Sequence, residues 1–91
     1  MASVSVGLAS VQNAQAICSG AIQDLNGSAE RLTHRYNNAG AEWHDNKYDQ
    51  LGSIVNDCVR AMRAPIDELF ECLGKLQEIE KAIIAYESQN F

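Results

Sequence analysis

Residues 37–46 read NNAGAEWHDN and interrupt two long apolar patterns. Asn38 and Gly40 are typical of the end of a helix, where one residue often adopts a left-handed conformation. Asp45 or Asn46 can cap the helix that follows, because a short polar side chain there accepts hydrogen bonds from free backbone N–H groups. A link this short makes its two helices antiparallel neighbours.

Apolar residues recur at alternating intervals of three and four on both sides of this stretch. Before it, with Gln15 the one exception, they are Leu8, Val11, Cys18, Ile22, Leu25, Ala29, Leu32 and Tyr36. After it, with Pro65 the exception, they are Tyr48, Leu51, Val55, Cys58, Met62, Leu69, Cys72, Leu76, Ile79, Ile83 and Tyr86. This spacing predicts two helices that pack along one seam. We expect one all-α domain over 1–91, with a helix over about 6–37, a turn over about 38–45 and a helix over about 45–88.

Pairing about the turn predicts which residues meet across the seam. Tyr36 is expected to pack against Tyr48, and Cys18 is expected to lie opposite Pro65. Pro65 lacks a backbone N–H and should kink the second helix.

The three cysteines form no Cys-x-x-Cys motif. In the predicted register Cys72 faces Val11, and Cys58 lies two heptads from Cys72 on the same helix, about 21 Å away. No pair is then expected to form a disulfide within the chain without distorting the hairpin. We expect reduced, buried thiols, which suit a reducing cytoplasm.

Composition excludes several classes of protein. The chain has 91 residues and a formal net charge of −5, with all of that charge in residues 42–91. A chain this acidic is not expected to bind nucleic acid. It has no apolar run of about 20 residues and no Sec-type signal peptide, so we expect no membrane insertion.

Further apolar residues lie off the seam. Small residues repeat every seven positions before the turn, at Gly7, Ala14, Ala21 and Ser28, and large ones follow it at Ile54, Val59, Ile66, Phe70, Leu73 and Ile84. Two helices cannot bury so much apolar surface. We expect pairing with a second copy or a homologous hairpin into a four-helix bundle, through Ile54, Val59, Ile66, Phe70, Leu73, Ala14 and Ala21. A higher oligomer stays open.

Residues for catalysis are sparse. The two histidines belong to no nucleophilic or phosphate-binding motif, and Glu42, His44 and Asp45 form only a weak metal-binding cluster. We expect no enzyme, no metal and no cofactor. Trp43, the single Trp, either packs onto the end of the hairpin or contacts a partner.

This layout resembles the Trp-X-Gly family of small helical-hairpin proteins of bacterial type VII secretion. The turn motif corresponds to Trp43-His44-Asp45, with Asp45 in place of Gly, and the export signal to Tyr86 and Asn90, with Asn90 in place of an acid. The resemblance implies a non-enzymatic interaction module that binds a hairpin partner, a secretion ATPase or a toxin. It also implies folding in the cytoplasm and export without a Sec signal. Two alternatives stay open: a structural protein that forms rings or filaments, and a cytoplasmic chaperone or adaptor for a secreted toxin.

Overall fold

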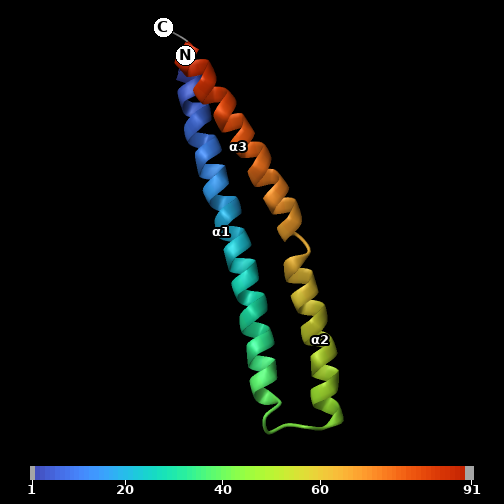
Figure 1. Ribbon diagram of the computed structural model, residues 1–91. Coiled ribbons are helices and arrows are strands. Elements are labelled where there is room, and N and C mark those ends of the chain that lie inside the picture. The colour runs from blue at the N-terminus through green and yellow to red at the C-terminus, as the bar shows by residue number, and fades with distance from the viewer. Residues whose placement is uncertain (1, 90–91) are drawn as a thin grey trace. The chain divides into compact units, whose positions relative to one another are not determined.

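A computed structural model describes the backbone of residues 2–89 and the side chains of residues 7–89. Within that range the protein is all-α, with helices α1 (Ala2–Ala39), α2 (Asn46–Arg63) and α3 (Ile66–Gln89) and no strand (Figure 1). The predicted fold class is confirmed. The first helix extends two residues beyond its predicted end and four before its predicted start.

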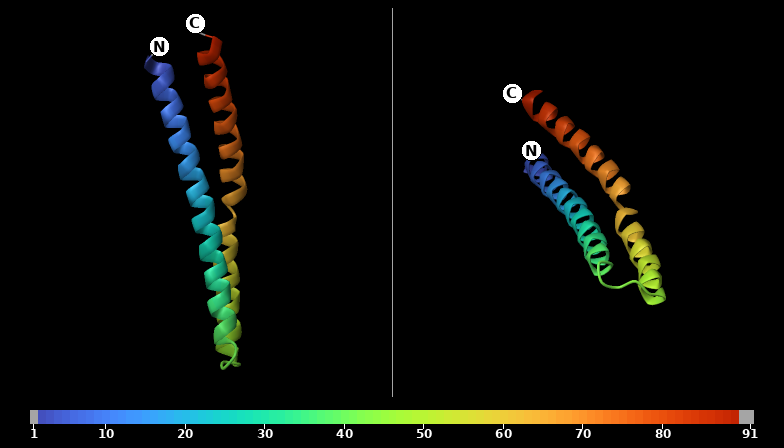
Figure 2. Two further views of the ribbon diagram at one scale, coloured as in Figure 1. Left: turned by 60° about the vertical axis from the view of Figure 1, so that its left-hand side comes forward. Right: turned by 60° about the horizontal axis from the view of Figure 1, so that its bottom comes forward.

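The helix predicted over about 45–88 is divided at Ala64 and Pro65 (Figure 2). Ala64 still has helical backbone angles, and its N–H donates to the Arg60 carbonyl over 2.9 Å. Pro65 has no N–H with which to continue this ladder, and its ring would clash with the carbonyl four residues earlier. The proline therefore ends α2, and α3 begins at the next residue.

The chain forms two compact units. The turn unit, residues 23–67, holds the second part of α1 and all of α2, and it buries Ala29, Val55 and Ile66. The terminal unit, residues 1–22 and 68–91, pairs the first part of α1 with α3 and buries Cys18 and Ile22. In the described part of the chain, no large side chain is fully buried. Each unit therefore has a small core of its own.

The terminal unit is an antiparallel helix pair. Near the start of α1, the position of a Cβ on Gly7 lies 3.9 Å from Ile83 Cδ1. Further along, the side-chain amides of Gln12 and Gln15 donate to the Glu80 carboxylate over 2.9 and 3.0 Å. These contacts fix the register in which α1 meets α3.

That register corrects the predicted pairing of the cysteines. Cys18 was expected opposite Pro65, and Cys72 opposite Val11. Instead, the Cys72 thiol lies beside Cys18. Burial raises the pKa of the Cys18 thiol, and the neighbouring Cys72 thiol raises it further. Pro65 is the physical reason, because a pairing counted outward from the turn assumes an unbroken helix. The prediction that no disulfide could form within the chain assumed the earlier pairing of Cys18 with Pro65 and of Cys72 with Val11, and that pairing was wrong.

The end of α1 also differs from the prediction. No residue in the described range has a positive φ, so neither Asn38 nor Gly40 is left-handed. The last turn tightens instead, since the N–H of Gly40 donates to the Asn37 carbonyl over 3.1 Å and that of Ala41 to Asn38 over 3.2 Å. These three-residue bonds satisfy carbonyls that a helix end leaves free.

Candidate functional site

Asp45 organises the turn between α1 and α2. Its Oδ1 atom accepts hydrogen bonds from the backbone N–H of Lys47 over 3.0 Å and of Tyr48 over 3.1 Å. The backbone of Asp45 is extended, as an N-cap requires. The same oxygen accepts a third bond, from Trp43 Nε1 over 2.7 Å. One carboxylate thus starts α2 and holds the indole, which a Gly at this position could not do.

Trp43 both packs against the turn and stays accessible. Its ring meets Tyr48 edge-on, with centroids 5.5 Å apart and planes at 61°. Even so, 37% of the residue is exposed. The indole is therefore oriented by two contacts while part of its surface remains free for a partner.

Tyr36 and Tyr48 clasp α1 to α2. Their rings stack with centroids 4.3 Å apart and planes at 8°, which confirms the pairing predicted for these two residues. The Tyr36 hydroxyl donates to the Tyr48 carbonyl over 3.2 Å, and the Tyr48 hydroxyl donates to the Tyr36 carbonyl over 2.8 Å. Burial raises the pKa of the Tyr36 hydroxyl, and the hydrogen bond with Tyr48 raises it further.

Two glycines make room for this clasp. A Cβ on Gly40 would collide with the Tyr48 hydroxyl and lie 2.8 Å from its Cζ. A Cβ on Gly52 would likewise collide with the Tyr36 hydroxyl and lie 2.9 Å from its Cζ. Gly40 is therefore needed for close approach and not for a left-handed turn, a role that the sequence pattern did not reveal.

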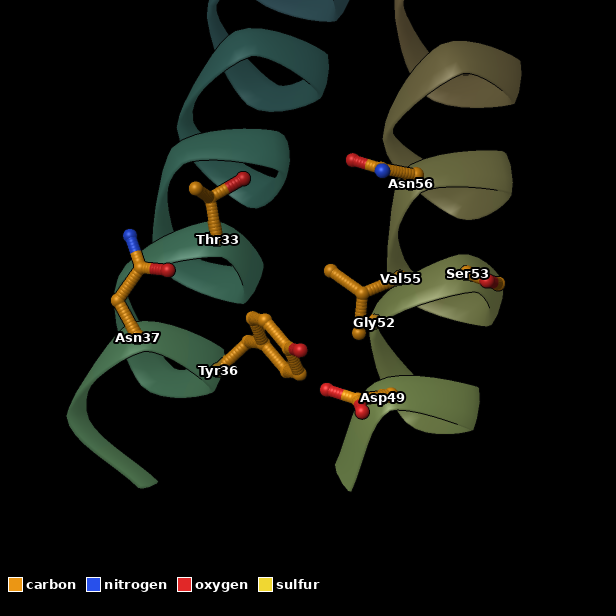
Figure 3. Close-up of a pocket in the computed structure, with 8 residues that line it drawn as sticks. All are labelled: Thr33, Tyr36, Asn37, Asp49, Gly52, Ser53, Val55 and Asn56. Atoms are coloured by element: carbon orange, nitrogen blue, oxygen red, sulfur yellow. The ribbon is translucent and has the colours of Figure 1, made fainter. Parts of the chain in front are cut away.

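An open groove of about 310 Å³ lies beside the clasp (Figure 3). Tyr36 extends into it from α1, and Val55 extends toward it from α2. The remaining lining is mostly polar: Thr33, Asn37, Asp49, Gly52, Ser53 and Asn56. With so polar a lining, the groove is hydrated and provides no apolar pocket for a ligand.

The residues predicted to form an oligomer interface fall into three groups. Ile54 and Phe70 are exposed over 59% and 53% of their surface. Ile66 is buried within the chain and is not available to a partner. The others are half-buried: Ala14, Ala21, Val59 and Leu73.

Additional apolar residues are exposed in the terminal unit. Ile17 on α1 is 68% exposed, and Ile79, which the spacing assigned to the seam, is about half exposed. Since an α-helix turns by about 100° per residue, one side of the inward-facing part of α3 carries Phe70, Leu73 and Ile84. Ile79 and Tyr86 lie on the other side. The spacing of three and four residues identifies only the seam positions. It therefore did not single out Ile17, which precedes the seam residue Cys18.

The remaining predicted site residues are not brought together. His44 is exposed in the turn, Tyr86 is exposed on α3, and Asn90 lies outside the described residues. Within residues 2–89 no group of three His, Cys, Asp or Glu side chains is arranged to hold a metal ion.

Comparison with protein-family models, curated proteins and solved structures found no match to this chain. Among the helices described, none combines the length and apolar character needed to cross a membrane.

Proposed function

We propose that the protein is a non-enzymatic interaction module that pairs with a second helical hairpin, its own copy or a homologue, as a four-helix bundle. The carrying observation is the set of large apolar side chains left exposed on all three helices: Ile17, Ile54, Phe70, Ile79, Ile84 and Tyr86. Burying such residues is the main favourable term in helix association.

The small core supports the same proposal. Only five residues of the described chain are buried apolar residues, and two of them, Ala29 and Cys18, are small. A helix pair with so little buried surface is marginally stable alone. Exposed apolar residues on both sides of the inward face of α3 give a partner hairpin two stripes to cover.

Phe70→Glu tests the pairing. A half-exposed Phe at an interface centre is the type of residue whose loss weakens association about tenfold or more. Ala85→Glu is the matched control, because Ala85 is exposed on the same helix and lies about 100° from both Ile84 and Tyr86, between the two apolar sides. Sedimentation across a concentration series should show a dimer for the unaltered chain and for Ala85→Glu, and a dissociating dimer for Phe70→Glu. Equal behaviour of both variants would reject this face.

The same measurement separates the alternatives. A discrete particle much larger than a dimer would favour a protein that assembles into rings or filaments. A partly unfolded monomer would favour a chaperone or adaptor that folds on its toxin, because the missing partner would then supply the rest of the core.

A finer proposal follows from the resemblance to the Trp-X-Gly family. The bundle folds in the cytoplasm and is exported by type VII secretion without a Sec signal, with Trp43 and Tyr86 read by the secretion ATPase or a toxin partner. Both residues are partly exposed, as recognition requires. Trp43→Ala and Tyr86→Ala should each reduce export from a cell that carries the system, and Trp43→Ala should do so without changing the dimer. Unchanged export of both variants would contradict this proposal while leaving the pairing intact.

A further inference from the structure

The register of the terminal unit places Cys18 and Cys72 at the same level. Gly7 faces Ile83, with 3.9 Å between the Cβ position and Cδ1. Cys18 lies eleven residues further along α1, and Cys72 lies eleven residues back along α3. Because the helices are antiparallel, both steps run in the same direction over about 16 Å. Eleven residues are also about three full turns, so each cysteine keeps the orientation of the residue from which it is counted.

The surroundings of the two thiols agree with this geometry. Cys18 is 8% exposed and therefore points into the seam, whereas Cys72 is exposed. Burial raises the pKa of the Cys18 thiol, and the adjacent Cys72 thiol raises it further. One thiol is thus shielded between the helices, and its neighbour is open to reagents in solution.

We propose that Cys18 and Cys72 form a reversible intramolecular disulfide that locks α1 to α3. The oxidant is a small-molecule disulfide such as oxidised glutathione. The accessible Cys72, as its thiolate, attacks one sulfur and releases the first small thiolate, which leaves a mixed disulfide on Cys72. The Cys18 thiolate then attacks the Cys72 sulfur and displaces the second small thiol. The protein gives up two protons and two electrons, and the small disulfide is reduced to two thiols.

The disulfide would tie together two residues that are 54 positions apart in the sequence. Cross-linking across so long a loop restricts the unfolded chain strongly, which raises stability. In the reduced state only noncovalent contacts hold the two helices of the terminal unit. This lock does not depend on the proposed partner, since both sulfurs belong to one chain.

Peptide mapping of the full chain tests the lock. Trypsin cleaves after Lys and Arg and so places the cysteines on separate peptides, 1–31, 48–60 and 64–75. After treatment with oxidised glutathione at low protein concentration, peptides 1–31 and 64–75 should be joined within a chain of monomer mass. The melting temperature should rise by about 10 °C or more and return on reduction.

Cys58→Ser is the matched control, because Cys58 is exposed on α2 in the other unit. It should oxidise as the unaltered chain does, whereas Cys18→Ser should stop at a glutathione adduct on Cys72. Circular dichroism of the reduced variants checks that they fold. If Cys58→Ser gave only stable adducts on Cys72, or only links between chains, the proposal would be overturned.

Discussion

The two units hold their helices together by different means. The turn unit uses directed contacts: stacked tyrosines that exchange hydrogen bonds, glycines that admit their rings, and an aspartate that binds three donors. The terminal unit uses packing along a seam, with two Gln–Glu hydrogen bonds and a pair of thiols.

Aromatic stacking and large exposed apolar side chains are thus divided unequally between the two units. Directed contacts have one geometry and therefore fix how α1 meets α2. The terminal unit contains most of the exposed large apolar side chains, at Ile17, Phe70, Ile79, Ile84 and Tyr86. In the proposed function, the terminal unit therefore supplies most of the surface for a partner.

Among the substitutions considered for stability, Gly52→Ala should change the free energy of unfolding most, although it adds only one methyl group. Alanine normally gains up to about 1 kcal/mol over glycine inside a helix. At Gly52, however, the new Cβ would overlap Tyr36 and disrupt the stack, and overpacking of this kind costs about 1–3 kcal/mol. We expect the free energy of unfolding in urea to fall by about 1–2 kcal/mol.

Gly74→Ala is the matched control in the terminal unit. A Cβ there meets nothing within 4 Å, so the helix preference should prevail. The free energy of unfolding should rise by about 0.5–1 kcal/mol. Changes of the same sign in both variants would show that the two units do not differ as described.

Asp45→Ala should have the next largest effect. The variant loses the cap of α2 and the hydrogen bond that orients Trp43. Loss of an N-cap costs about 1 kcal/mol. Trp43 fluorescence should shift as the indole is released, and Asp45→Asn should retain most of the stability, because its side-chain oxygen can still accept. An unchanged spectrum in Asp45→Ala would contradict the proposed anchoring role.

Much of the turn unit could be predicted from the sequence. A cap at Asp45 or Asn46 and the pairing of Tyr36 with Tyr48 follow from local chemistry and short chain separation. The structure identifies Asp45 as the cap and confirms the tyrosine pairing. The role of Gly40 could not be predicted, since its need for space arises from a tyrosine that reaches it only in the folded turn.

The register of the terminal unit could not be predicted by the same means. Spacing of three and four identifies the inward face of α3 but not which residue of α1 lies opposite. Beyond Pro65, counting from the turn no longer applies, and Cys18 meets Cys72 instead of Pro65. The burial of Ile66 was missed for the same reason. The spacing of three and four residues in an unbroken helix would place Ile66 off the seam, but the helix breaks directly before it.

The smallest predicted effect is a pH dependence specific to the terminal unit. Hydrogen bonds from Gln15 and then Gln12 lower the pKa of Glu80 from its ordinary value of 4.5. A carboxyl whose pKa is lower in the folded state contributes stability above its unfolded pKa and loses it as the pH falls through the folded pKa. Between neutral pH and about pH 3, unfolding free energy should therefore fall more in the unaltered chain than in Glu80→Gln, whose amide does not titrate. Gln15→Ala should weaken the dependence in the same direction, because it removes the donor that lowers this pKa most. Identical urea midpoints against pH in all three proteins would show that these contacts do not stabilise the pairing of α1 with α3.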